Sequence, residues 1–84
     1  MNLLFAPQAW EDYQFWHDGD KKILKRVNRL IEETSRNPFE GIGKPEPLKG
    51  DKRGYWSRRI TDEHRFVYKS EGYTLKIAQL RYHY

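Results

Sequence analysis

The chain has 84 residues, enough for one domain with a single core, and it contains no cysteine. Disulfide frameworks and thiolate metal sites are therefore excluded, and a cytoplasmic setting fits this composition. No apolar run approaches the ~18 residues that a membrane span needs, and the N-terminus lacks a signal-peptide pattern, so we expect no membrane association.

The formal net charge is +4, and it is unevenly distributed along the chain. Residues 1–43 contain six Lys and Arg against seven Asp and Glu, whereas residues 44–84 contain ten against five. A basic, aromatic-rich half favours a polyanionic partner, with nucleic acid ahead of a membrane surface. Basic composition also serves solubility alone, so charge by itself is a weak indication.

The first half predicts a strand and two helices. Residues 2–5 form a short apolar strand, and Pro7 suits the first position of a helix that Gly19 ends, over roughly residues 7–18. Three aromatic residues recur at a spacing of three and predict its packing face: Trp10, Tyr13 and Trp16.

A second, amphipathic helix follows this turn. Asp20 is a favourable N-cap, and Asn37-Pro38 ends the helix because a residue before proline avoids the α region. Its apolar stripe, which should pack on the sheet, consists of Ile23, Leu24, Val27, Leu30, Ile31 and Thr34. The charged residues between them predict a solvated face.

Residues 38–54 contain three of the four prolines and four of the six glycines, a composition that predicts no regular element. A loop of this length in a small domain is usually functional or disordered. Gly41-Ile42-Gly43-Lys44 lacks the spacing and the trailing Ser or Thr of a phosphate loop. Prolines on both sides of Glu46 are more informative, because they restrict the backbone and present this carboxylate stiffly.

Three strands complete the chain, over residues 55–60, 64–69 and roughly 73–82, with turns at 61–63 and 71–72. The order of elements predicts a single α+β domain over residues 1–84, a small and mainly antiparallel β-sheet with both helices on one face. If the last strand runs to its end, alternation places His83 with Arg81 and Tyr84 on the other face. Both His83 and Tyr84 reach one site only if the chain leaves strand geometry.

The basic half combines a carboxylate, an imidazole and several guanidinium groups, and cleavage of RNA would use all three without a metal. RNA carries its own nucleophile, the 2′-hydroxyl, so it needs a base, an acid and cations on the phosphate. Glu46 could be the base, His83 the acid, and Arg65 or Arg59 the phosphate clamp. Metal-assisted hydrolysis is disfavoured, because the three histidines (17, 64 and 83) lack ligand spacing.

Other interpretations remain open at this point. Glu63 and His64 could form an acid–base pair, although neighbours on a strand point to opposite faces and a turn accounts better for Glu63. Arg58 and Arg59 also face opposite ways, so one of them at most reaches the site. A non-catalytic RNA- or DNA-binding module would use the same basic face, but there Glu46 would repel the ligand.

Several long stretches of the chain resemble the YoeB toxins of the RelE superfamily. They are Asn37-Pro38-Phe39-Glu40-Gly41-Ile42-Gly43-Lys44-Pro45-Glu46-Pro47-Leu48-Lys49, then Gly54-Tyr55-Trp56-Ser57-Arg58-Arg59-Ile60-Thr61-Asp62-Glu63-His64-Arg65-Phe66-Val67-Tyr68, and the terminal Arg81-Tyr82-His83-Tyr84. The resemblance implies a microbial-ribonuclease-like (RelE-like) fold and the toxin of a type II toxin–antitoxin system. Such a toxin is a ribosome-dependent, metal-independent endoribonuclease that cuts mRNA in the ribosomal A site.

The resemblance also implies roles and partners. The family's base matches Glu46, its transition-state arginine Arg65 and its acid His83. Its RNA-positioning residues match three further positions, namely Lys49, Arg59 and Tyr84, and the last of these also belongs to the expected catalytic group. The expected partners are the ribosome, mRNA and a YefM-like antitoxin, with no cofactor; operator DNA bound by the toxin–antitoxin complex and a homodimer are left open.

Overall fold

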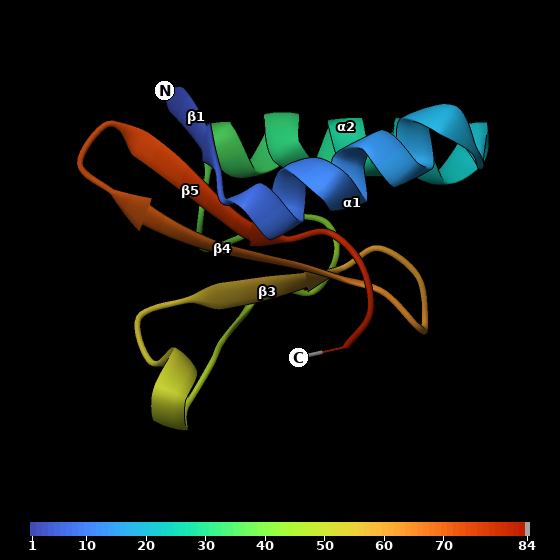
Figure 1. The fold of residues 1–84 in the computed structure, drawn as a ribbon. Coiled ribbons are helices and arrows are strands. Elements are labelled where there is room, and N and C mark those ends of the chain that lie inside the picture. The colour runs from blue at the N-terminus through green and yellow to red at the C-terminus, as the bar shows by residue number, and fades with distance from the viewer. Residues whose placement is uncertain (84) are drawn as a thin grey trace.

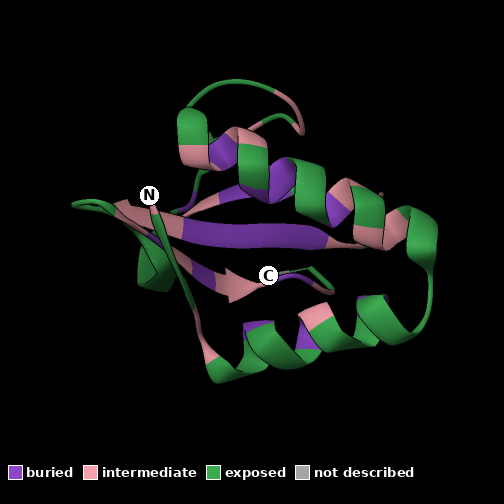
Figure 2. Cartoon of the chain, turned by 90° about the horizontal axis from the view of Figure 1, so that it is seen from above, coloured by how far each residue is buried: buried purple, intermediate pink, exposed green. Residues whose placement is uncertain are grey.

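The computed structural model describes residues 1–83 and forms two layers, a sheet and a pair of helices (Figure 1). The elements in chain order are β1 (Asn2–Phe5), α1 (Pro7–Asp18), α2 (Lys21–Arg36), β2 (Glu46–Pro47), the 3₁₀ helix η1 (Gly50–Lys52), β3 (Trp56–Arg59), β4 (Arg65–Glu71) and β5 (Thr74–Gln79). The strand order is β1-β5-β4-β3-β2; β1 pairs with β5 in parallel and the remaining pairs are antiparallel. Both helices cover one face, which confirms the predicted α+β class (Figures 1 and 2).

The second helix matches its prediction closely. The Asp20 carboxylate accepts hydrogen bonds from the backbone N–H groups of Lys22, at 2.9 Å, and Ile23, at 3.2 Å. This cap satisfies two of the donors that a helix N-terminus leaves without partners. The residues that α2 buries lie on the predicted stripe: Val27, Leu30, Ile31 and Thr34. Within residues 1–83, no helix is long and apolar enough to cross a lipid bilayer.

The packing face of α1 differs from its prediction. Trp16 is 4% exposed and Tyr13 packs partly buried against the core, as predicted, but Trp10 is 49% exposed and stacks on the Tyr13 ring. Each step of three residues falls about 60° short of a full turn, so the two ends of a three-residue series diverge around the helix. The positions that α1 buries are Ala9, Asp12 and Trp16, a set that includes a carboxylate.

The loop between α2 and β3 contains two elements that its composition did not predict. Glu46 and Pro47 form the edge strand β2, opposite Ser57 and Trp56 of β3, and η1 follows. Proline is compatible with an edge strand, because its missing N–H would face away from the sheet. The expectation of no regular element in residues 38–54 was therefore wrong at these positions.

The last strand ends at Gln79, three residues earlier than predicted, because α1 takes over its hydrogen bonds. The Leu80 N–H donates to Asp12 Oδ2 at 3.0 Å, and Trp16 Nε1 donates to the Leu80 carbonyl at 2.8 Å. Tyr82 then adopts a positive φ of 64°. Residues 81–83 leave strand geometry, so the predicted alternation of faces does not apply to them.

Arg58 is buried beneath the helices and does not belong to the predicted group of phosphate-binding cations. Its side chain is 0% exposed; it donates to the Tyr68 hydroxyl and to three loop carbonyls, those of Asn37, Glu40 and Ile42. Tyr68 in turn donates to the Pro38 carbonyl at 2.6 Å. Burial raises the pKa of Tyr68, and the hydrogen bond from Arg58 opposes that rise. Arg58 thus ties the loop after α2 to the sheet.

We expect Arg58→Met to destabilise the protein by at least ~3 kcal/mol, because the buried guanidinium makes four hydrogen bonds and a hydrogen bond to a charged group contributes ~1.5–3 kcal/mol. Chemical denaturation followed by tryptophan fluorescence measures the change. Arg59→Met is the matched control: Arg59 is exposed, so this change should stay within ~0.5 kcal/mol. Equal losses in the two variants would show that the Arg58 contacts do not hold the loop.

Candidate functional site

The predicted site residues gather on the sheet face that the helices leave open. Glu46 on β2 lies opposite Ser57 on β3, Ser57 lies opposite Val67 on β4, and Val67 lies opposite Gln79 on β5. Residues directly opposite one another share a face. Phe66, Tyr68 and Ile77, the neighbours in the alternation, pack into the core beneath the helices. The row from Glu46 to Gln79 therefore lies on the face without helices, here called the open face, although its middle residues Ser57 and Val67 are buried, at 1% and 2% exposed.

Two arginines lie on the same face, next to this row. Arg59 and Arg65 are directly opposite each other on β3 and β4, two residues along from Ser57 and Val67. With strands about 4.8 Å apart, the Cα atoms of Glu46 and Arg65 are separated by on the order of 10 Å. Long side chains span such a gap, with a phosphate between them. Glu46 and Arg59 are exposed, whereas Arg65 is 8% exposed.

The guanidinium of Arg65 is held in place by the turn before β4. Its Nη1 donates to three carbonyls, those of Thr61 at 2.7 Å, Asp62 at 3.1 Å and His64 at 3.1 Å. Three bonds to one nitrogen fix the plane of the group before any ligand binds. A preorganised cation loses little side-chain entropy on binding an anion.

The chain end folds back onto the open face near Gln79. Gln79 Nε2 donates to the carbonyls of Arg81 at 2.7 Å, Tyr82 at 3.0 Å and His83 at 3.2 Å. The guanidinium of Arg81 lies 3.4 Å from the centre of the Phe15 ring and 4.6 Å from that of Tyr82. Figure 1 shows the chain after β5 curving beneath β3 and β4. The structure thus brings His83 to the end of the row that starts at Glu46, whereas Tyr84 lies outside the described residues.

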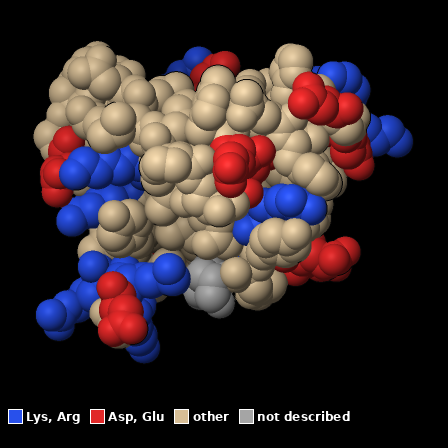
Figure 3. All heavy atoms as spheres, viewed as in Figure 1, with Lys and Arg blue, Asp and Glu red and all other residues tan. Residues whose placement is uncertain are grey.

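Further cations surround the row. Lys49 is exposed just before η1, and Figure 3 shows Lys and Arg side chains gathered over that end of the molecule. Lys69 and Lys76 both bind Glu71, with N to O distances of 3.4 and 2.6 Å. Hydrogen bonds from the two lysines lower the pKa of Glu71, and the bond to Glu71 raises that of Lys76. Glu71 therefore offsets part of the positive charge of this face.

Within residues 1–83, no group of three or more His, Cys, Asp or Glu side chains could hold a metal ion. The open face carries a carboxylate and guanidinium and ammonium cations, and the segment that leads to His83 is bound to Gln79 at the end of the row through its backbone carbonyls. Sequence reasoning missed the positioning roles of Asp12, His64 and Gln79. A carboxylate inside the buried stripe of α1 was a visible signal for Asp12, but nothing marked Gln79.

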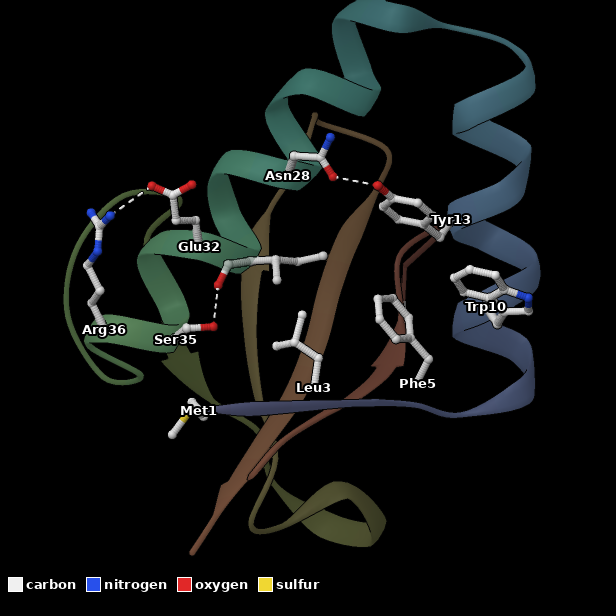
Figure 4. A pocket seen from close by; sticks show the side chains of 10 residues that line it. Met1, Leu3, Phe5, Trp10, Tyr13, Asn28, Glu32, Ser35 and Arg36 are labelled. Carbon is white, nitrogen blue, oxygen red and sulfur yellow. Dashed lines mark hydrogen bonds and ion pairs between the residues drawn. The ribbon is translucent and has the colours of Figure 1, made fainter. Parts of the chain in front are cut away.

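A hollow of about 700 Å³ lies on the helix-covered side of the sheet, between β1 and the two helices (Figure 4). Its lining is mainly apolar, with Leu3, Phe5 and Trp10 near the β1 edge. At its rim Tyr13 donates to Asn28 Oδ1 at 2.8 Å. This hollow does not include any of the predicted site residues.

Comparison with known proteins identifies the family. The family model for the YoeB-like toxin of bacterial type II toxin–antitoxin systems matches residues 5–84. Toxin YoeB of Streptomyces coelicolor is 57% identical over 84 residues, which cover all of both chains.

Solved structures agree with this similarity. A YoeB/ParE toxin from Agrobacterium tumefaciens is 51% identical, with both chains fully covered and a TM-score of 0.97. The toxin of a YoeB–YefM complex from Staphylococcus aureus is 48% identical, with a TM-score of 0.92 over all of this chain and 98% of that one. A YoeB dimer from the same species is 49% identical, with the same coverage and a TM-score of 0.93. The RelE-like fold is thereby confirmed, and the chain belongs to the YoeB-like toxins of bacterial type II toxin–antitoxin systems.

Proposed function

We propose that this toxin is a ribosome-dependent endoribonuclease, which cleaves mRNA in the ribosomal A site and thereby inhibits translation. The observation that carries the proposal is the common face of Glu46, Arg59 and Arg65, onto which Gln79 folds the segment that ends in His83. A base, cations and an acid are the three components that transfer of an RNA phosphate to its own 2′-hydroxyl requires.

Each residue has one role in this reaction. Glu46 removes the proton from the 2′-hydroxyl, and the oxygen attacks the adjacent phosphorus. Arg65, with its guanidinium already fixed, binds the non-bridging oxygens as negative charge builds on them, and Arg59 assists from the neighbouring strand. His83 gives its proton to the departing 5′-oxygen.

The products are a 2′,3′-cyclic phosphate and a 5′-hydroxyl. Afterwards Glu46 carries the proton that His83 needs, and exchange with water restores the starting states. RNA supplies the nucleophile and side chains move both protons, so the proposed reaction needs no metal or cofactor. Lys49 and Tyr84 would position the RNA on either side of the cleaved bond.

A non-catalytic RNA- or DNA-binding module is the alternative function. The basic face would serve it equally well. Glu46 argues against it, because a carboxylate beside phosphate-binding cations weakens binding. Removal of the 2′-hydroxyl proton in the proposed cleavage explains why a carboxylate is present there.

Primer extension on a translated message tests the proposed function. We expect new 5′ ends within the codon at the A site when ribosomes are present, and none on the same message without ribosomes. Thermal melting of each protein sample confirms that the toxin is folded. A folded protein that binds the message and leaves it intact under both conditions would favour the binding module.

We further propose that a YefM-like antitoxin controls this toxin, as the Staphylococcus aureus complex suggests. The antitoxin would cover the basic face or displace the chain end, and it should be acidic where it binds. Self-association, as in the Staphylococcus aureus dimer, and binding of operator DNA by the toxin–antitoxin complex belong to the same proposal.

The charge complementarity of this interface can be measured. We expect Arg59→Glu to weaken binding of the cognate antitoxin by about 10- to 100-fold at low salt, because like charges across an interface repel. Calorimetric titrations at low and high salt should show a smaller salt dependence for the variant. Lys22→Glu, a change on an exposed helix position away from the sheet, is the control. Affinity that responds neither to salt nor to Arg59→Glu would exclude coverage of the basic face.

A further inference from the structure

The side chain of His64 bonds to the backbone of the chain end. Its Nδ1 accepts a hydrogen bond from the Tyr82 N–H at 2.8 Å. The ring is partly buried, and it meets the ring of Trp16 edge to face at 4.8 Å and that of Tyr82 at 5.9 Å. The sequence left an acid–base pair of His64 with Glu63 open and disfavoured it; in the structure, His64 Nδ1 accepts from the chain end.

This hydrogen bond defines the protonation state of the ring. A backbone N–H can donate only to a nitrogen with a free lone pair, so Nδ1 carries no proton and Nε2 carries the proton of the neutral ring. An imidazolium has N–H groups at both nitrogens. Protonation of His64 would therefore place an N–H group at Nδ1, opposite the Tyr82 N–H, and two donors cannot form a hydrogen bond. The bond to Tyr82 would break.

This contact is one of those that hold the conformation of Tyr82. Its φ of 64° lies in the left-handed region, which is unfavourable for a residue other than glycine. Three residues hold its backbone there: His64 accepts from its N–H, and the Arg65 N–H and Gln79 Nε2 both donate to its carbonyl, each at 3.0 Å. The next residue in the chain is His83.

We propose that His64 is a positioning residue. Its neutral ring holds Tyr82 through the hydrogen bond from the Tyr82 N–H to Nδ1, here called the latch, so that His83 lies over the open face. Protonation of His64 breaks this bond and releases the chain end. The role of the latch in cleavage depends on the proposed function of His83 as the acid. The latch itself rests only on the contacts of His64 and Tyr82.

The surroundings of the ring contain charges of both signs. Arg65 bonds to the His64 carbonyl, and Arg81 lies over the Tyr82 ring that contacts His64. On the preceding turn, Asp62 and Glu63 are exposed. Helix α1 contributes the neutral ring of Trp16 and, at Leu80, the buried Asp12 carboxylate.

The two histidines would need opposite protonation states. His83 must carry a proton to act as the acid, whereas His64 must be neutral to hold the chain end. Conditions that protonate His64 should therefore slow cleavage, because they break the bond to Tyr82, and conditions that remove the proton of His83 should slow it as well.

Nitrogen NMR of the isotopically labelled protein tests the latch without any activity measurement. At pH 7.5 we expect His64 to show an unprotonated Nδ1 and a protonated Nε2. On acidification, the Tyr82 amide signal should shift with the same midpoint as the His64 ring. A proton on Nδ1 at pH 7.5, or a Tyr82 amide that does not respond to protonation of His64, would overturn the proposal.

Two variants separate latching from packing. His64→Asn keeps an acceptor near the position of Nδ1 and cannot take up a proton, whereas His64→Phe keeps the ring against Trp16 and removes the acceptor. In single-turnover cleavage on programmed ribosomes, we expect His64→Phe to be slower by about 10-fold or more, with little change in KM. His64→Asn should stay within about 3-fold of the parent at pH 7.5 and lose the decline on the acid side.

His17→Asn, at an exposed position of α1, is the matched control and should leave the pH profile unchanged. Equal losses in both His64 variants, with the acid decline retained in His64→Asn, would reduce His64 to a packing residue and refute the latch. If no variant and no parent protein cleaves, the proposed function fails, while the NMR titration still decides whether the latch exists.

Discussion

Glu46→Gln should cleave a translated message at least ~100-fold more slowly than the parent protein, because an amide cannot remove the proton from the 2′-hydroxyl and one general base accounts for ~10²–10⁴ in rate. The same variant should bind RNA as well or better, since the change removes a negative charge from a phosphate-binding face. Primer extension measures the cleavage, and fluorescence anisotropy with a labelled RNA measures the binding.

Glu71→Gln provides the matched control for charge. It also removes a carboxylate from the basic region and frees Lys69 and Lys76 for phosphate, so RNA binding should strengthen while cleavage persists. If both variants bind RNA more tightly and only Glu46→Gln stops cleaving, then both carboxylates weaken RNA binding through their charge, but only Glu46 takes part in cleavage. Undiminished cleavage by Glu46→Gln would remove this residue from the mechanism.

Removal of His83 and Tyr84 should leave a folded protein that has lost cleavage by at least ~10², the contribution of one general acid. The contacts that anchor the chain end lie upstream of the cut: Asp12 and Trp16 bind Leu80, and His64 binds Tyr82. The truncated protein should therefore melt within about 4 °C of the parent, which corresponds to a loss of less than ~1 kcal/mol. It should still bind RNA.

His83→Gln distinguishes the imidazole from the rest of the segment, because it keeps Tyr84 and a hydrogen-bonding side chain but cannot deliver a proton at neutral pH. We expect a loss of cleavage similar to that of the truncation. Removal of Tyr84 alone provides the comparison for the phenol. Full cleavage by the protein that lacks both residues would contradict the role assigned to His83.

Local patterns predicted much of this fold, because each depends on neighbours in the chain. The cap at Asp20 and the apolar stripe of α2 are examples, and both are confirmed. The end of β5 could not be predicted in this way. It is set by two hydrogen bonds between α1 and Leu80, across 68 and 64 residues of sequence: the Leu80 N–H donates to the Asp12 carboxylate, and Trp16 Nε1 donates to the Leu80 carbonyl. These partners are in place only once α1 has packed on the sheet.

In the candidate site, too, local patterns were predictable from the sequence and contacts made by the tertiary fold were not. Alternation along β3 predicted that Arg58 and Arg59 face opposite ways, but not which one reaches the open face. The answer depends on the loop carbonyls that surround Arg58, and these are arranged by the tertiary fold. Gln79 could not be recognised either, because its role is to bind the backbone of residues that were expected to continue the strand.

A single chemical substitution in the substrate tests the proposed reaction most directly. A ribosome is programmed with a short message in which the nucleotide before the cleaved bond of the A-site codon lacks its 2′-hydroxyl, and the all-ribose message is the control. We predict cleavage of the control message to a 2′,3′-cyclic phosphate and a 5′-hydroxyl, with no detectable cleavage of the 2′-deoxy message. Equal cleavage of both messages would contradict attack by the 2′-hydroxyl and, with it, the roles proposed for Glu46 and His83.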